Sequence, residues 1–331
     1  MVDRIYIEKQ VAEHPRTIAI CARFPKATKI QIDRYGEVFN PKAQNFRAQK
    51  QNPALILAHK HKNRVLAAPP GYGIGSQRNF YFSHMMNCIY DCRYCFLQGM
   101  YPSANYVLFV NYQDYQDEIR QVAAQYPDEE CHFFSGYDCD SLAWEPVTQF
   151  ANIFLDSFAD LPNALMEIRT KSTQVRSLLE RPPIPQAVIA FSLSPDTQIA
   201  QQESRTPHLA KRLRALVQLQ QAGWKIGLRF DPVVYSDQYQ QDYQSLFQQC
   251  FAALDPASLH SVSLGMFRLP ESFHKRMVNL YPEEPLLYRK LETKQGMVTV
   301  QSGLEQEMLG HLELLLLAYI QPKQYFPCVS A

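Results

Sequence analysis

Short apolar segments alternate with longer amphipathic segments along the chain from residue 79 onward. The apolar segments have the composition of buried strands and lie at 79–83, 107–110, 131–134, 164–168, 187–193 and 225–230. The amphipathic segments predict helices at 112–125, 145–158, 173–179, 208–222 and 239–254. Strands that alternate with helices predict an α/β fold with a parallel sheet. In a β/α barrel, chemistry gathers in the loops at the C-terminal ends of the strands.

Segments of different character flank this alternating region. A run of turn signals at 69–75 marks the expected entry into the barrel, and the tail from residue 322 has no regular pattern. The predicted organisation is an N-terminal unit at 1–75 with strands at 5–7 and 30–32, a barrel at 76–255, and a C-terminal extension at 256–331 with a strand at 262–264 and an apolar helix at 304–319.

A basic run interleaved with amides lies in the N-terminal unit. Its cations are Lys42, Arg47, Lys50, Lys60, Lys62 and Arg64. Such a run can contact nucleic acid through phosphates. A solvated face or a linker has the same composition, and we favour that interpretation.

Composition narrows the class of protein. The formal net charge of +1 indicates no global basic field for nucleic acid, although a local patch would suffice. No run of 18 apolar residues predicts a membrane span, and the N-terminus lacks the pattern of a signal peptide. Eight cysteines without a secretory signal favour a reducing compartment, so we expect a cytoplasmic protein without a disulfide framework.

Three cysteines carry the most specific chemical signal. Cys88, Cys92 and Cys95 have the spacing C-x3-C-x2-C, directly after the strand at 79–83. Thiolates are the usual ligands of iron–sulfur clusters, which normally take four, so three would leave one iron of a four-iron cluster open. A zinc site would need a fourth ligand, and His84 and Cys131 lack the spacing of a second hook. Buried cysteines that serve only as small apolar residues are the other alternative.

The cysteine loop and its surroundings resemble the radical S-adenosylmethionine signature, in particular that of the spore photoproduct lyase family. The likeness rests on the three cysteines, on Tyr94 before the last of them and on the continuation YCFLQ, and it extends from the opening IYIEK to about Pro232. It implies a partial (β/α)6 TIM-type barrel and a [4Fe–4S] cluster on Cys88, Cys92 and Cys95. S-Adenosylmethionine would bind the open iron, and its reductive cleavage would yield a 5′-deoxyadenosyl radical that abstracts hydrogen from a substrate.

The resemblance also assigns cofactor-binding positions after the later strands. These are Ser135, Gly136, Lys171, Ser192 and Ser194. Lys171, within the sequence RTKS, would pair with the carboxylate of S-adenosylmethionine, whereas a lone lysine after a strand is usually exposed. Gly136 can equally be an ordinary turn residue, and the serines can equally belong to turns.

Other polar residues near the strand ends have structural alternatives of equal or greater weight. Asp140 can cap the helix that follows it, and we favour that role over substrate binding. For Glu145 we make no assignment. Arg229 and Asp231, at the end of the strand 225–230, can form a structural ion pair as readily as they can face a substrate.

Two radical-relay positions differ from the spore photoproduct lyases. A gapless alignment places Tyr137 where those enzymes have the cysteine that quenches the product radical, with Cys139 two residues further on. Phe96 replaces a tyrosine, whereas Tyr94 matches. We therefore take Cys139, Tyr137 and Tyr94 as the candidate catalytic residues, and we expect the chain to resemble the wider family more than the repair enzyme itself.

Two hypotheses about function follow. The first is a radical S-adenosylmethionine enzyme that acts on a small molecule or a nucleic-acid base or nucleotide, DNA included, and receives its electrons from a reductant such as flavodoxin or ferredoxin. The second is a non-catalytic iron–sulfur or zinc module that binds nucleic acid through the basic run, with Tyr101 and Tyr106 stacking on bases.

Overall fold

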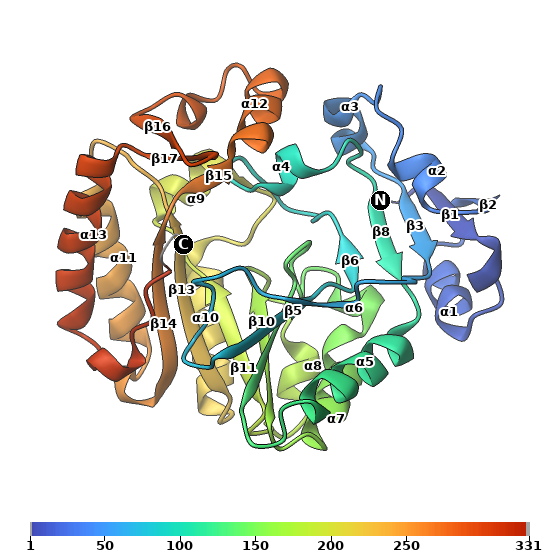
Figure 1. Cartoon of the computed structure of the whole chain (residues 1–331), viewed down its shortest axis with the longest axis horizontal. Coiled ribbons are helices and arrows are strands. Elements are labelled where there is room, and N and C mark those ends of the chain that lie inside the picture. Colours follow the sequence, from blue (N-terminus) through green and yellow to red (C-terminus); the bar gives the residue numbers. More distant parts are fainter. Residues whose placement is uncertain (1, 329–331) are drawn as a thin grey trace.

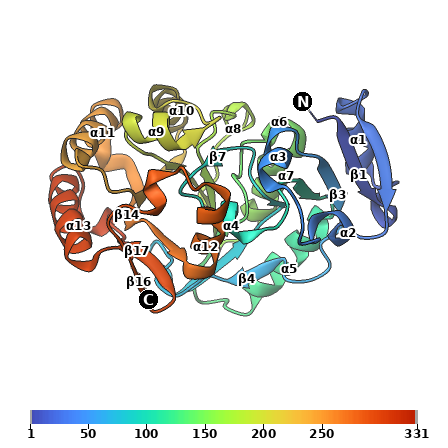
Figure 2. The same ribbon diagram turned by 90° about the horizontal axis from the view of Figure 1, so that it is seen from above.

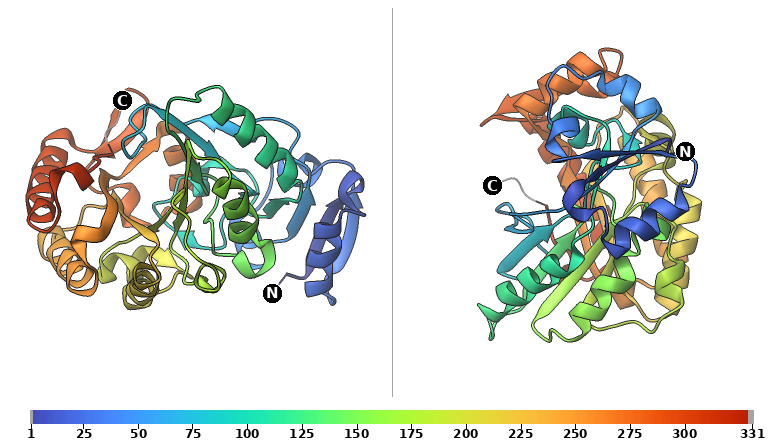
Figure 3. Two further views of the ribbon diagram at one scale, coloured as in Figure 1. Left: turned by 90° about the horizontal axis from the view of Figure 1, so that it is seen from below. Right: turned by 90° about the vertical axis from the view of Figure 1, so that its right-hand side faces the viewer.

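The computed structural model describes residues 2–328, which fold around two sheets (Figure 1). The larger sheet has the strand order β14-β13-β11-β10-β9-β5-β4, and the smaller, N-terminal sheet has the order β2-β1-β3-β8-β6. The N-terminal sheet and helix α13 (Ser302–Leu317) lie at opposite ends of the molecule (Figures 1 and 3).

Six parallel strands form the partial barrel and confirm the predicted fold class. They are β5 (Arg78–Phe82), β9 (Cys131–Ser135), β10 (Ala164–Thr170), β11 (Ala187–Ser192), β13 (Lys225–Val233) and β14 (Leu259–Met266), and β4 (Val65–Ala67) adds an antiparallel edge strand. Most of their side chains are buried, which explains why these strands read as continuous apolar runs rather than alternating ones.

Helices cover the outer face of this sheet (Figure 2). They are α5 (Tyr112–Ala124), α6 (Glu145–Thr148), α7 (Phe150–Ala159), α8 (Arg176–Leu179), α9 (Asp196–Gln202), α10 (Leu209–Gln221), α11 (Tyr239–Ala253) and α13. Helix α10 buries leucines at helical spacing and ends before Gly223, whose φ of 88° suits a glycine. The helix predicted at 145–158 is two helices, because Gln149 adopts a left-handed φ of 49° between them. No helix in the described part of the chain has the length and apolarity of a membrane span.

The N-terminal sheet contains one strand that we predicted for the barrel. It consists of β1 (Arg4–Glu8), β2 (Thr28–Ile32), β3 (Leu55–Ala58), β6 (Met85–Met86) and β8 (Tyr106–Phe109), with α1 (Pro15–Arg23), α2 (Gly36–Phe39) and α3 (Phe46–Gln51) between them. The segment 107–110 was expected as the second barrel strand, but β8 pairs with β3 and β6 instead. The sixth parallel strand is β14, which is longer than the predicted 262–264. A strand buried on both faces has the same sequence pattern in either sheet, so the pattern does not specify its partner.

One stretch of chain, residues 78–86, connects the two sheets. Its first half, β5, pairs with β9, and its second half, β6, pairs with β8. At the bend, the His84 carbonyl accepts a hydrogen bond from the Phe109 amide, and the Phe82 carbonyl accepts one from the Gly136 amide. The cysteine loop follows this bend directly and is therefore fixed to both sheets.

The C-terminal extension crosses the barrel top and then returns along its edge. Helix α12 (Glu271–Leu280) and the small sheet of β15 (Arg268–Pro270), β16 (Leu291–Lys294) and β17 (Met297–Val300) lie over the loops at the top. Helix α13 confirms the helix predicted at 304–319. The tail is more regular than expected, since the amides of Phe326 and Cys328 donate to carbonyls of β14. The last three residues of the predicted tail lie outside the described residues.

A buried ion pair stabilises the barrel interior. The Arg229 guanidinium on β13 contacts the Glu167 carboxylate on β10 at 2.7 Å, and both side chains are almost fully buried. Burial alone would raise the pKa of Glu167, but Arg229 and then Arg169 outweigh it and lower this pKa from 4.5 to about 2. Arg229 therefore pairs across the barrel and not with Asp231.

Replacing Glu167 by glutamine should destabilise the fold by about 3–5 kcal/mol, because it leaves a buried cation unpaired. Because the pKa of Glu167 is lowered, its ionised carboxylate stabilises the fold fully above pH 4.5, and this stabilisation is lost as the pH falls towards 2. The difference in unfolding free energy between wild type and variant should therefore narrow between pH 4.5 and 2. Urea unfolding at several pH values measures this difference. Glu180→Gln, which breaks an exposed pair with Arg176, is the matched control and should cost about 0.5 kcal/mol or less. Equal effects of the two substitutions would contradict the prediction.

Candidate functional site

A cavity of about 420 Å³ opens at the C-terminal ends of the barrel strands. Its walls come from the cysteine loop, from the loop after β9, from the C-terminal ends of β10, β11 and β13, and from the segment 266–270, which begins at the last residue of β14. Loops at this end of a barrel are where catalytic groups are expected. The cavity brings together most of the predicted site residues: Cys88, Cys92, Cys95, Tyr94, Gly136, Tyr137, Cys139, Lys171 and Ser192.

The three cysteines of the loop all line this cavity. The loop is held in place by strand β7 (Asp91–Cys92), which pairs with β12 (Glu203–Ser204), and by the Arg93 amide, which donates to the Gln202 carbonyl at 2.8 Å. Helix α4 (Leu97–Met100) follows the last cysteine. The backbone around the cysteines is thus fixed by contacts with a distant segment.

Burial keeps these thiols protonated when no metal is bound. It raises the pKa of Cys88 to about 12, with Asp140 as the next cause, and it raises the pKa values of Cys92 and Cys95 as well. Lys171 acts in the opposite direction on Cys92 and Cys95. Because metal ligation requires thiolates, cluster binding here would release protons.

The donor set fits a multi-iron cluster better than a single metal ion. Within residues 2–328, no three side chains of histidine, cysteine, aspartate or glutamate converge closely enough to hold one ion. A zinc site needs four ligands around one centre. In a four-iron cluster each thiolate binds a different iron, so the sulfurs lie further apart. Three thiols of one short loop line the cavity here and could each bind a different iron.

Lys171 lies beside the cysteine loop at the end of β10. Its ammonium is 5.5 Å from the centre of the Tyr94 ring, and no carboxylate in residues 2–328 lies within ion-pair distance of it. Its backbone amide donates to the Asp140 carboxylate at 2.6 Å. Lys171 is thus a cation in the cavity wall that can accept a carboxylate partner.

Asp140 has a structural role close to the one we favoured. Its carboxylate accepts hydrogen bonds from the amides of Leu142 and Ala143 and from the Thr170 hydroxyl. It caps the turn before α6 rather than the helix itself, because α6 begins only at Glu145. Glu145 is buried and accepts from the Ala151 amide, so it faces the fold and not the cavity.

The predicted cofactor-binding serines differ in where they lie. Ser192 lines the cavity, whereas Ser135 and Ser194 do not. The Ser135 hydroxyl donates to the Glu167 carbonyl, and the Ser194 hydroxyl donates to Glu203 at 2.8 Å. Gly136 lines the cavity with φ of 78°, and a Cβ there would lie 2.4 Å from the Ser141 hydroxyl oxygen, so packing alone already requires a glycine.

The candidate radical-relay residues occupy one side of the cavity. The Tyr137 ring lies against Tyr81 and Phe96, at centroid distances of 4.4 Å and 5.3 Å. Cys139 is buried, and its sulfur lies 4.0 Å from Nδ1 of His84. Phe96 and Tyr137, the two positions that differ from the lyases, are therefore in direct contact.

A buried network behind the cysteine loop was not predicted. Glu203 pairs with Arg212 on α10 and accepts a hydrogen bond from the Tyr94 hydroxyl. Burial raises the pKa of Glu203, but Lys171 and Arg212 outweigh it and lower the pKa overall. No local pattern indicates this network: Arg212 lies on the buried face of α10 with Leu209 and Leu216, where a charged residue is not expected, and Glu203 lies between the predicted elements.

Two further cations in the cavity wall were also missed. Arg169 and Arg268 line the cavity together with two carboxylates, Asp140 and Asp231, of which Asp231 is 3.8 Å from Arg169. Arg268 donates to the carbonyl and the sulfur of Cys328, and no carboxylate in the described part of the chain pairs with it. With Lys171, the wall has three cations against two carboxylates and therefore an excess of positive charge.

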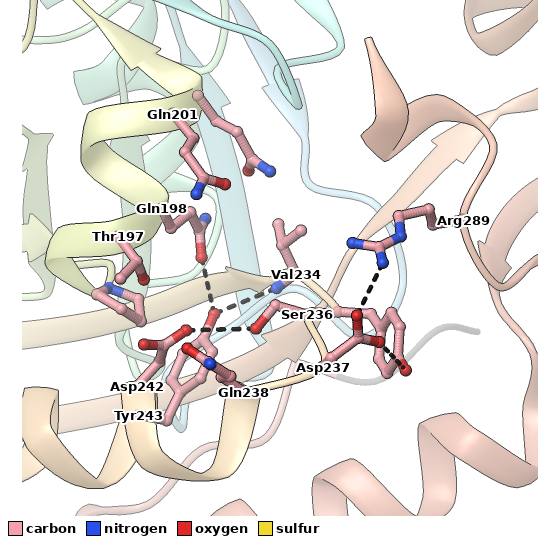
Figure 4. Close-up of a pocket in the computed structure, with 13 residues that line it drawn as sticks. Thr197, Gln198, Gln201, Val234, Ser236, Asp237, Gln238, Asp242, Tyr243 and Arg289 are labelled. Carbon is pink, nitrogen blue, oxygen red and sulfur yellow. Dashed lines mark hydrogen bonds and ion pairs between the residues drawn. The ribbon is translucent and has the colours of Figure 1, made fainter.

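A second pocket, of about 240 Å³, lies between α9, the loop after β13 and Arg289 (Figure 4). Its polar groups largely satisfy one another: Arg289 pairs with Asp237 at 2.8 Å, and the Tyr243 hydroxyl donates to Gln198. It contains none of the predicted site residues.

The partial barrel and the three-cysteine loop define a protein of the radical S-adenosylmethionine class. A family model described as spore photoproduct lyase matches residues 79–297, so the chain belongs to the spore photoproduct lyase family. The members of this family are enzymes, lyases that use a [4Fe–4S] cluster and S-adenosylmethionine.

Individual relatives agree with this assignment. Spore photoproduct lyase of Bacillus subtilis (strain 168) is 24% identical over 270 residues, which cover 80% of this chain and 77% of the relative. The enzyme of Geobacillus sp. (strain Y412MC61) is 22% identical over 182 residues, 55% of this chain and 53% of the relative. A solved double variant of spore photoproduct lyase with bound AdoMet and dinucleoside spore photoproduct superposes with a TM-score of 0.87 at 17% identity, over 100% of this chain and 99% of that one.

Proposed function

We propose that this chain binds a [4Fe–4S] cluster through Cys88, Cys92 and Cys95 and uses it, with S-adenosylmethionine, to abstract hydrogen from a nucleotide-type substrate. When bound, the cluster supplies the electron that cleaves the sulfonium and yields the 5′-deoxyadenosyl radical. The observation that carries the proposal is that one cavity collects the three thiols, Ser192 and the Lys171 ammonium, which no carboxylate of residues 2–328 pairs with.

The chain's own residues would divide the remaining work. Lys171 would hold the cofactor's carboxylate, because its ammonium has no carboxylate partner among the described residues. Ser192 and the backbone at Gly136 would orient the cofactor's polar groups. Tyr94, held by Glu203, keeps the loop between Cys92 and Cys95 in one conformation. Tyr137 or Cys139 would return a hydrogen atom to the product radical.

The charge of the cavity supports a nucleic-acid substrate. Arg169, Lys171 and Arg268 outnumber the two carboxylates that line the cavity, Asp140 and Asp231, and arginine suits phosphate recognition. A solved relative contains a dinucleoside spore photoproduct, so repair of a DNA photoproduct is the reaction that we propose by analogy. The electrons would come from a reductant such as flavodoxin or ferredoxin.

Anaerobic reconstitution with iron and sulfide, followed by dithionite and S-adenosylmethionine, tests the proposal. We expect formation of 5′-deoxyadenosine, detected by liquid chromatography. A protein that takes up iron and sulfide but forms no 5′-deoxyadenosine would instead be the non-catalytic iron–sulfur module.

Replacing Lys171 by alanine should weaken the binding of S-adenosylmethionine by about 2–5 kcal/mol and leave the iron and sulfide content unchanged. The reason is that the variant leaves the cofactor's carboxylate unpaired in a partly buried site. Equilibrium dialysis with labelled cofactor measures the effect, with Lys60→Ala as a control. Unchanged affinity in Lys171→Ala would assign this lysine to the surface.

A further inference from the structure

Basic side chains surround the outer side of the cysteine loop, on the face turned away from the cavity. We call this surface the outer patch; it consists of Arg47, Lys50, Arg93, Arg205 and Tyr281. None of these residues lines the cavity, although Arg93 lies between Cys92 and Tyr94 in the loop itself.

Contacts between four separate segments hold the outer patch together. The guanidinium groups of Arg93 and Arg47 lie over the Tyr281 ring, 4.1 Å and 5.4 Å from its centre. Arg205 donates to the Lys50 carbonyl at 3.0 Å. The segments are α3, the cysteine loop, the residues after β12 and the end of α12. Figure 2 shows α3, α12 and the elements of the cysteine loop, β7 and α4, from above.

The outer patch has an excess of positive charge. Its four cations contact two carboxylates, since Asp91 pairs with both Arg93 and Lys50, and Glu283 pairs with Arg47. The side chain of Arg47 remains 52% exposed, and Arg205 is exposed. Arg47 and Arg205 are therefore available to a negatively charged surface, whereas Lys50 is buried.

A short chain of hydrogen bonds connects the outer patch to the cysteine loop. The Tyr281 hydroxyl donates to the side-chain oxygen Oε1 of Gln98 at 2.9 Å. The side-chain nitrogen Nε2 of Gln98 in turn donates to the Cys92 backbone carbonyl at 3.2 Å and to the Asp91 carboxylate at 2.8 Å. One buried side chain thus separates Tyr281 from the backbone of a proposed cluster ligand.

We propose that the outer patch is the docking surface for an acidic one-electron carrier protein of the flavodoxin type. This inference rests on the proposed function, which requires one electron per cofactor cleaved: the reduced carrier loses it and the cluster gains it. Electron transfer slows steeply with distance, and a carrier on the outer patch would sit beside the loop that holds the proposed ligands. Complementary charge steers the diffusional encounter of two such proteins. The interfaces of electron-transfer complexes are typically small, less than about 1,200 Å².

Nucleic acid is the other polyanion that a basic surface can bind, but the position of the outer patch disfavours it. The substrate has to enter the cavity, whose walls include Arg169, Arg268 and the segment 266–270. The outer patch lies behind the cysteine loop. A strand of DNA bound there would not present a base to the cavity.

The test compares the wild type with the double variant Arg47→Glu, Arg205→Glu, and with Lys323→Glu as a control. Lys323 is exposed and lies at the opposite end of the barrel, beside Gln324, which contacts the start of β14. Binding of oxidised flavodoxin to each reconstituted protein is measured by interferometry at low and high salt. We expect the double variant to bind about tenfold more weakly at low salt and to lose the salt dependence, with the control unchanged.

Activity provides a second, independent readout. With flavodoxin, its reductase and NADPH, the double variant should form 5′-deoxyadenosine more slowly than the wild type, whereas with dithionite the two rates should be equal. Failure of the wild type with dithionite would overturn the proposed function, while the flavodoxin affinities would still report on the surface. Equal flavodoxin affinities of wild type and double variant, or a loss confined to oligonucleotide binding, would overturn the docking proposal.

Discussion

Alanine at position 88 should leave the reconstituted protein without its iron–sulfur chromophore, the absorption band at roughly 400 nm. Cys88, Cys92 and Cys95 are the only cysteines of the loop, and all three line the cavity. With three local ligands, loss of one leaves the cluster with two, so cluster and cofactor cleavage should both disappear. Iron and sulfide analysis together with the absorption spectrum measures the effect, and Cys92→Ala and Cys95→Ala should behave alike.

The remaining cysteines supply controls of matched chemistry. Cys21 is half-buried in the N-terminal unit, and Cys250 and Cys328 lie on α11 and in the tail. Their alanine variants should keep the full chromophore. Full iron and sulfide content in Cys88→Ala would show that the ligand assignment is wrong.

Repair of the thymine-dimer spore photoproduct should be slow in the wild type and faster in Tyr137→Cys, while formation of 5′-deoxyadenosine persists in both. Thiols deliver hydrogen atoms to carbon radicals faster than phenols do, and Tyr137 stands at the position of the lyases' cysteine. Its ring is also packed between Tyr81 and Phe96, which limits its motion. Thymine release from the dinucleotide photoproduct, measured beside 5′-deoxyadenosine, tests this expectation.

Cys139 is the competing hydrogen donor, and two variants separate it from Tyr137. It lines the cavity, but its buried sulfur lies near His84. Tyr137→Phe should change repair little if the phenol is a poor donor. Multiple-turnover repair by the wild type that vanishes in Cys139→Ala would identify Cys139 as the donor and contradict our alignment of this loop.

The sequence predicted the barrel and the cysteine loop because both leave local patterns. Apolar strands, helix stop signals such as Gly223 and closely spaced cysteines are visible within a few residues. The partner of an apolar strand is not local, so β8 was assigned to the wrong sheet. The pairing of Glu203 with Arg212 and of Arg229 with Glu167 likewise depends on tertiary contacts between segments that no local pattern connects.

The split of the predicted helix at 145–158 has a different cause. Gln149 carries no signal of a helix end, yet it adopts the left-handed conformation between α6 and α7. The carboxylate of Glu145 then accepts the Ala151 amide at the start of α7. A side chain six residues away thus replaces the helical hydrogen bond, which a pattern of apolar positions does not reveal.

The sharing of residues 78–86 between the two sheets has a consequence for any shortened form of this protein. Removing residues 1–75 would take β3 away from β8, whose four residues are all buried. The exposed edge of β8 would then offer unpaired backbone amides and carbonyls beside apolar side chains, the arrangement that recruits strands from other chains. The N-terminal strands therefore act as a protective border for the barrel, and a chain cut at the glycine-rich entry would be prone to aggregate.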